Sequence, residues 1–154
     1  MTDELPLRRA RAEDAAAVAD LVNRAYAKYV ARIGRPPAPM LDDYPDVIRQ
    51  HDVWITEEGG TMVAVLVLIP EKDILLIDNI AVDPSYQGRG LGRRLMAFGE
   101  SEARRQGLSS LRLITNEKMT ENIAFYARLG YRENGREIIR ERYVVHMRKD
   151  LSNR

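Results

Sequence analysis

Residues 74–95 read ILLIDNIAVDPSYQGRGLGRRL, an apolar run followed by a turn with three glycines and the start of a helix. Gly88, Gly90 and Gly92 allow the backbone to approach a ligand closely. The start of the following helix offers free N–H groups and a partial positive charge, which suit phosphate oxygens. Arginines add full charges at the same place, namely Arg89, Arg93 and Arg94. The stretch therefore predicts a strand that leads into a phosphate-binding turn.

Two common phosphate-binding motifs do not fit this turn. A P-loop requires a Gly-Lys pair, and the chain contains none. A dinucleotide fingerprint requires a third glycine, but the two frames place Arg93 or Leu95 there. It also requires an acidic residue near the end of the next strand, and residues 108–112 contain none.

The remaining pattern resembles the GCN5-related N-acetyltransferase (GNAT) superfamily. Gln87, Gly90 and Gly92 match its [RQ]-x-x-G-x-[GA] signature. Residues 122–131, NIAFYARLGY, are similar to its N-x-x-x-[YF]-x-x-x-G-[YF] block. The resemblance covers nearly the whole chain, from residue 7 to residue 149.

The resemblance implies an α/β (α+β) fold with a mixed central sheet of about six to seven strands and about four helices. The sheet would be splayed between its fourth and fifth strands, with acetyl-coenzyme A in the splay. Residues 1–154 would form one N-acetyltransferase domain, a length that suffices to bury a core.

The same resemblance assigns the cofactor-binding residues. Strand backbone would pair with the pantetheine amides, and N–H groups of residues 87–92 would hold the pyrophosphate. The asparagines of the set have turn or helix capping as an alternative role. The full set is Ile80, Ala81, Val82, Gln87, Gly88, Arg89, Gly90, Leu91, Gly92, Arg93, Asn116 and Asn122.

The expected reaction is direct attack of a neutral amine on the thioester. Tyr126, by its place in the family block, would protonate the departing thiolate; its alternative role is that of a core aromatic. A base must also take a proton from the amine, since amines have a pKa near 10. Asp78, Glu117 and ordered water all stay open for this role.

The composition excludes several other chemistries. The chain has no cysteine and two histidines in unrelated segments, so neither a thiolate nor a metal site is expected. A net charge of +1 argues against nucleic-acid binding. No apolar run approaches 18 residues and the start is acidic, so we expect a cytoplasmic protein without a membrane segment. A homodimer is left open.

Periodicity and turn residues predict the remaining elements. The expected helices are 13–33, 41–50, 90–106 and 120–129. The expected strands are 5–9, 53–57, 62–69, 74–82, 111–115, 131–138 and 143–147. The strand 74–82 is expected to be buried on both faces, and Gly99 to lie where the third helix packs closely. For the last hairpin, Asn134-Gly135 competes with 139–142 as the turn.

The acceptor is expected to lie beside the first two helices and the proline-rich loop 34–39. Candidate lining residues are Tyr26, Tyr29, Arg32, Met40, Asp42, Asp43 and Tyr44. The acidic segment 39–60 would favour a cationic amine on a small molecule or a peptide, although solvated charges are the simpler explanation. A coenzyme A-binding regulatory or structural module without catalysis is the alternative function.

Overall fold

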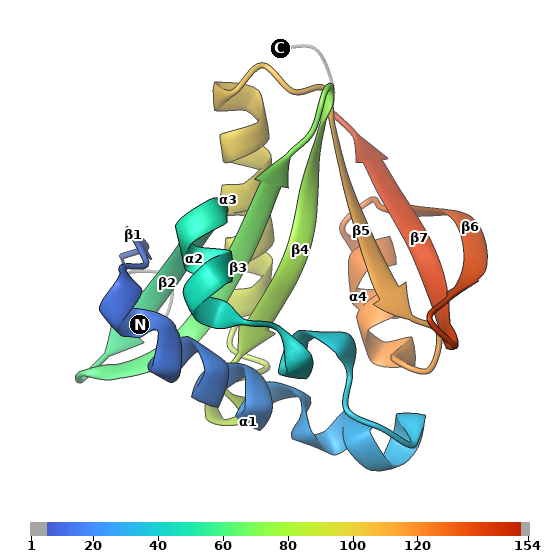
Figure 1. The fold of residues 1–154 in the computed structure, drawn as a ribbon. Coiled ribbons are helices and arrows are strands. Elements are labelled where there is room, and N and C mark those ends of the chain that lie inside the picture. The colour runs from blue at the N-terminus through green and yellow to red at the C-terminus, as the bar shows by residue number, and fades with distance from the viewer. Residues whose placement is uncertain (1–5, 152–154) are drawn as a thin grey trace.

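A computed structural model describes residues 6–151 as a seven-stranded mixed sheet with helices on both faces (Figure 1). The strand order is β1-β2-β3-β4-β5-β7-β6. The strands are β1 (Arg8–Arg9), β2 (Asp52–Glu58), β3 (Thr61–Pro70), β4 (Ile74–Val82), β5 (Ser110–Asn116), β6 (Arg132–Ile139) and β7 (Arg142–Asp150). The α-helices are α1 (Ala15–Ile33), α2 (Tyr44–Gln50), α3 (Leu91–Arg105) and α4 (Thr120–Arg128).

The predicted fold class is confirmed, with two local corrections. The second helix begins at Tyr44 and not at residue 41, because Asp43 caps it by accepting a hydrogen bond from the Asp46 N–H at 3.2 Å. Residues 38–41 instead form a separate 3-10 turn. The first strand is limited to Arg8–Arg9, and residue 5 of its predicted range lies outside the described residues.

The last hairpin turns within the 139–142 alternative. Arg140 and Glu141 connect β6 to β7, and both have positive φ angles, 49° and 66°. The Asn134-Gly135 pair lies inside β6, where the register with β7 shifts between Glu133 and Gly135. The local hairpin signal therefore marks a bulge, and the turn uses two residues that seldom adopt this conformation.

The sheet separates two hydrophobic cores, one on each face. The first packs against α3 and α4 and includes Leu66, Leu95 and Tyr126. The second packs against α1 and α2 and includes Leu21, Val65 and Tyr44. Alternate residues of β3 face opposite cores, as the strand's two-residue period requires.

An extra residue in β4 changes this alternation. Leu68 of β3 pairs with Ile77 and Val67 pairs with Asn79, so Asp78 has no partner in β3. In a regular strand, Ile77 and Ala81 would point to the same face because they are four residues apart. The extra residue reverses this, so Ile77 faces the first core and Ala81 faces the second. Asp78 itself is exposed, so the prediction that both faces of this strand are buried is wrong at that position.

The sheet opens at the same residue. β4 and β5 pair in parallel only from Ile74–Ser110 to Ile77–Leu113. Both strands continue beyond this point, β4 to Val82 and β5 to Asn116, each paired only on its far side. Figure 1 shows the two strands diverging toward the ends that face α1 and α4. The predicted splay between the fourth and fifth strands is present.

We expect Gly99→Ala to stabilise the protein by about 0.5–1 kcal/mol, because glycine costs this much inside a helix. Gly99 was predicted to allow close packing, but a methyl group there would meet its nearest side-chain atoms at 3.7–3.9 Å, an ordinary contact. Gly99→Leu should instead overpack the core and cost about 1–3 kcal/mol. Urea unfolding of both variants tests this, and a destabilised alanine variant would contradict it.

Candidate active site

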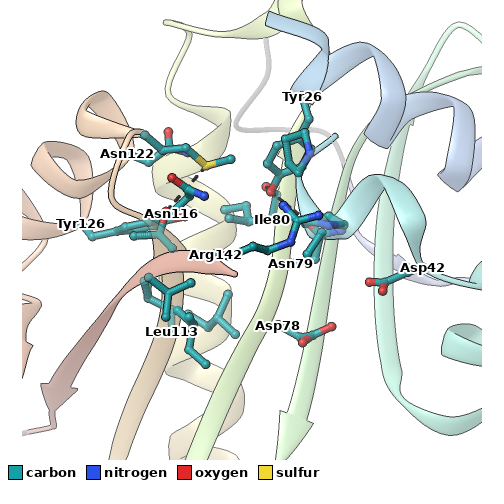
Figure 2. Close-up of a pocket in the computed structure, with 18 residues that line it drawn as sticks. Tyr26, Asp42, Asp78, Asn79, Ile80, Leu113, Asn116, Asn122, Tyr126 and Arg142 are labelled. Carbon is teal, nitrogen blue, oxygen red and sulfur yellow. Dashed lines mark hydrogen bonds between the residues drawn. The ribbon is translucent and has the colours of Figure 1, made fainter. Parts of the chain in front are cut away.

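Two cavities meet where the sheet is splayed. One, of about 550 Å³, lies between α1, the glycine turn and α4, and we call it the donor cavity. The other, of about 250 Å³, lies between β4, β5 and the loop before α2, and we call it the acceptor cavity (Figure 2). Residues that line both are Tyr26, Ile80, Asn122 and Tyr126.

The donor cavity contains most residues predicted to bind the cofactor. β4 contributes Ile80, Ala81 and Val82, which have no strand partner on the side of β5. The turn contributes Gln87, Gly88, Gly90, Gly92 and Arg93. Its backbone amides precede the first turn of α3, whose N–H groups have no partner within the helix. This cavity therefore combines an unpaired strand edge with a helix start whose free N–H groups are suited to an anion.

The glycine turn is shaped by backbone conformation. Gly88 and Gly90 have φ angles of 80° and 84°, which side-chain-bearing residues rarely adopt. The Gln87 side chain donates a hydrogen bond of 3.1 Å to the Val82 carbonyl, which ties the turn to the end of β4. Gln87 thus has a structural partner in addition to its place in the cavity wall.

Other predicted cofactor residues are placed differently. The Leu91 side chain is buried in the first core, so only its backbone faces the turn. Arg89 stacks over the Tyr86 ring at 4.9 Å and does not line either cavity. Asn116 lines the acceptor cavity, where its Oδ1 accepts a hydrogen bond of 2.9 Å from the Lys118 N–H. This is the turn-capping role that was the alternative for Asn116.

Tyr126 lies at the junction of the two cavities. Its side chain is almost fully buried, and its hydroxyl has no hydrogen-bond partner among residues 6–151. Burial raises the pKa of Tyr126 above its ordinary value, with a smaller effect from Tyr29, so the hydroxyl is protonated at neutral pH. It can therefore donate a hydrogen bond to a group that occupies the junction.

A buried hydrogen-bond network supports the wall between α1 and β4. The Tyr26 hydroxyl lies 2.9 Å from Asn79 Oδ1 and 3.0 Å from the Ile80 carbonyl oxygen. The amide of Asn79 donates to the Tyr44 hydroxyl at 3.0 Å, and that hydroxyl donates to the Pro39 carbonyl at 2.6 Å. The network fixes Ile80 and joins the proline-rich loop to the sheet.

Asp78 and Asp42 are the carboxylates that line the acceptor cavity. Desolvation by the surrounding protein raises the pKa of both side chains, and the charge of Asp78 raises that of Asp42 further. Figure 2 shows them near each other, from β4 and from the loop before α2. Glu117, the other predicted base, does not line this cavity and pairs with Arg136 at 3.5 Å.

Of the seven residues that were expected around the acceptor, two contribute to the wall of the acceptor cavity. These two are Tyr26 and Asp42, whereas Tyr29 lines the donor cavity. Arg32 lines neither cavity and pairs with Glu121 in the wall of the donor cavity. Met40 and Tyr44 pack in the second core, and Asp43 caps α2. Other acids of segment 39–60 form ion pairs away from the two cavities, including Asp46 with Arg49 and Asp52 with Arg9. Most of this acidic segment is thus structural.

Arg142 and Asn79 are cavity residues that the sequence interpretation missed. Asn79 stands beside Asp78 as a second polar residue in an apolar strand, and that signal was available. Arg142 follows the β6–β7 turn and carried no motif. Its Nη2 donates to the Pro36 carbonyl at 2.8 Å, and Arg35 donates to the Arg140 carbonyl at 2.8 Å. These bonds fasten the proline-rich loop over the cavity.

Comparison with known sequences identifies the family. The chain matches the family model described as "Acetyltransferase (GNAT) family" over residues 16–131. The chain belongs to this family. It is therefore an acyltransferase by descent, and the predicted recognition and enzyme class are confirmed.

Two Escherichia coli K12 relatives illustrate the range of this GNAT member's similarity. The uncharacterized N-acetyltransferase YjgM is 30% identical over 134 residues, covering 81% of this chain and 80% of that protein. The [ribosomal protein bS18]-alanine N-acetyltransferase is 36% identical over 76 residues, covering 49% of this chain and 51% of that protein.

Solved structures confirm the GNAT fold. The Escherichia coli ribosomal-protein-S18-alanine N-acetyltransferase has a TM-score of 0.75 at 22% identity, covering 97% of this chain and 96% of that one. The PaiA N-acetyltransferase of Thermoplasma acidophilum, in complex with coenzyme A, has a TM-score of 0.79 at 13% identity, covering 96% and 99%. The yncA protein of Salmonella typhimurium, solved with acetyl-CoA, has a TM-score of 0.73 at 19% identity, covering 98% and 96%.

The part of the chain that the structure describes has neither a membrane-spanning helix nor a cluster of metal-binding side chains. Among residues 6–151, no helix has both the length and the apolar character needed to cross a bilayer. Within the same range, no three histidine, aspartate or glutamate side chains gather where they could hold a metal ion.

We expect the folded GNAT domain to lose stability above pH 10. Burial raises the pKa of Tyr26, Tyr44 and Tyr126, so these hydroxyls stay protonated in the folded state while the unfolded chain ionises near pH 10. Their contribution is complete below pH 10 and is lost as the pH rises further. Urea midpoints between pH 8 and pH 11 measure this, and Tyr26→Phe should flatten the decline. A constant midpoint through pH 11 would contradict it.

Proposed function

We propose that this protein transfers the acetyl group of acetyl-coenzyme A to a primary amine on a small molecule or peptide, by direct attack. The observation that carries the proposal is the meeting of the donor and acceptor cavities at Tyr126 and Ile80. A thioester held in the first cavity would present its acetyl carbon to the second.

The residues of the donor cavity fit coenzyme A in three ways. The unpaired edge of β4 at residues 80–82 offers backbone groups to the pantetheine amides, as an added strand would use them. The amides of Gly88 and Gly90 and the start of α3 offer donors to the pyrophosphate. Arg93 supplies a positive charge in the same wall. When bound, acetyl-coenzyme A supplies the activated acetyl group.

The acceptor amine must lose a proton as it attacks. Asp78 and Asp42 both line the acceptor cavity, and we assign to Asp78, which projects from β4 beside the splay, the binding of the ammonium group and the receipt of its proton, directly or through water. Desolvation raises the pKa of Asp78, which makes it a stronger base than an exposed aspartate. Glu117 is not proposed for this role, because Arg136 holds it outside the cavity.

Tyr126 is proposed as the group that hydrogen-bonds to the departing thiolate and returns a proton to it. Its hydroxyl is protonated, lies at the cavity junction and has no partner within residues 6–151. Burial raises the pKa of this tyrosine above that of a thiol in water, near 8.5. Removal of the thiol from water would raise its pKa as well, which reduces the difference in pKa between the two groups.

The test is release of free thiol from acetyl-coenzyme A in the presence of a panel of primary amines, with mass spectrometry of the acetylated product. We expect amine-dependent thiol release above the rate of hydrolysis. Tight coenzyme A binding without release of thiol for any amine would favour the non-catalytic module.

The cytoplasmic location and a homodimer remain predictions from the sequence.

A protein N-terminus is a second candidate acceptor. It is favoured by the relative named for acetylating an alanine of a ribosomal protein, which is 36% identical over 76 residues. The panel therefore includes short peptides with a free amino terminus beside the small amines.

Tyr126→Phe should lower kcat by about 100-fold, as loss of a general acid does, and leave the Kd of coenzyme A nearly unchanged. Tyr131→Phe is a matched control, because its hydroxyl is also buried without a partner and its ring lies 6.1 Å from that of Tyr126. Tyr131 does not line either cavity. Unchanged turnover in Tyr126→Phe would refute the assigned role.

Gly90→Val should raise the Kd of coenzyme A at least about 10-fold, since a β-branched residue is strained at a φ of 84° and would reshape the turn. Gly60→Val is the control, with a φ of 81° in the β2–β3 hairpin away from both cavities. Both variants should lose stability, but only the first should lose affinity, measured by calorimetry. Equal affinity in the two variants would exclude the turn as the pyrophosphate site.

A further inference from the structure

Arg142 places a positive charge in the acceptor cavity. It is the first residue of β7, directly after the turn of Arg140 and Glu141. Its side chain reaches the cavity wall beneath the proline-rich loop, and Figure 2 shows it among the labelled lining residues. The proposed reaction gives no role to a cation at this point.

The hydrogen-bonding capacity of the Arg142 guanidinium is only partly used by the described residues. Nη2 donates to the Pro36 carbonyl at 2.8 Å, whereas Nη1 is buried and has no hydrogen-bond partner within residues 6–151. A buried donor without a partner costs about 1–3 kcal/mol, and more when it carries charge. Such a group in a ligand cavity is explained when the ligand supplies its acceptor.

Arg142 forms an ion pair with none of the carboxylates among residues 6–151. These carboxylates include Asp42 and Asp78, which line the same cavity. Burial lowers the pKa of Arg142, and the positive charge of Arg35 lowers it further. An anion beside Nη1 would relieve both effects, and a guanidinium is suited to bind a carboxylate.

The cavity therefore carries both signs of charge, with carboxylates at Asp42 and Asp78 and a guanidinium at Arg142. A purely cationic amine would satisfy the carboxylates and leave Nη1 unpaired. We propose that the acceptor is an amino acid, whose carboxylate binds Arg142 while its ammonium group binds at Asp78. This inference rests on the proposed acetyl transfer and names the substrate class for it.

The size of the cavity agrees with a small acceptor. Its volume of about 250 Å³ lies below the roughly 300–1,000 Å³ of cavities that hold drug-sized ligands. The loop that covers it is fastened on the side of β7 by the bonds of Arg35 and Arg142. A free amino acid would place both of its charged groups inside a cavity of this size, whereas most of a peptide would extend beyond it.

The test compares three forms of each common amino acid: the acid, its amide and the amine left by decarboxylation. Thiol release from acetyl-coenzyme A gives kcat/KM for each form. We expect at least one acid to exceed its amide and its decarboxylated amine by about 10- to 100-fold, the effect of one charged hydrogen-bonded pair. Equal or better turnover of the amide, or turnover of peptides alone, would overturn the inference.

Variants assign the preference to Arg142. Arg142→Gln should reduce the acid-to-amide ratio to about 1 while the decarboxylated amine is still acetylated, and Arg142→Lys should retain part of the ratio. Arg35→Gln is the matched control, because it also loses a loop-fastening bond but does not line the cavity. An equal fall for all three substrate forms in Arg142→Gln would show a merely structural role and refute the proposal.

A binding measurement separates this inference from the proposed reaction. With coenzyme A present, the acid should raise the Tm of the unsubstituted protein and not that of Arg142→Gln. If thiol release fails for every amine, the proposed reaction is wrong, but an acid-specific Tm shift would still support the binding site. Absence of any shift would overturn it.

Discussion

The extra residue at Asp78 is the constraint on which the rest of this structure depends. Up to Ile77, β4 is held between β3 and β5, and beyond it only β3 remains as a partner. A bulge increases local twist, so the strand turns away from β5 where the unpaired residue is inserted. The freed edge of β4 and the space beside it form the walls of both cavities. The bulge also turns Asn79 toward α1 and α2, where Tyr26 and Tyr44 bind it.

Charged side chains outside the two cavities form ion pairs that join elements of the fold. Arg8 forms a bidentate pair with Asp14 and a further bond with Glu57, which joins the first strand to the start of α1 and to β2. The pair lowers the pKa of Asp14 to about 2. In the same way, Arg112 is bound to Glu71 and Arg105 to Glu102. Once such pairs are accounted for, the charges that line the cavities are few, and their positions become informative.

Sequence patterns predicted those parts of the molecule that local chemistry determines. The limits of β4 follow from an apolar run ended by Pro84, and the shape of the glycine turn follows from Gly88 and Gly90, which take positive φ angles. The bulge at Asp78 was not predictable in this way, because register is a property of two strands together. Arg142 was missed for a related reason. Its position depends on a turn at Arg140 and Glu141, residues that turn preferences would not select over Asn134-Gly135.

The two cavities share their boundary at Tyr26, Ile80, Asn122 and Tyr126, and this has a consequence for the order of events. The chain has no cysteine, the most effective acyl-accepting side chain, with which to store an acetyl group between substrates. Donor and acceptor can instead occupy adjoining spaces at the same time. If acetyl transfer proceeds by the direct attack proposed above, both substrates bind before either product leaves, and initial-rate plots against either substrate would give intersecting lines and not parallel ones.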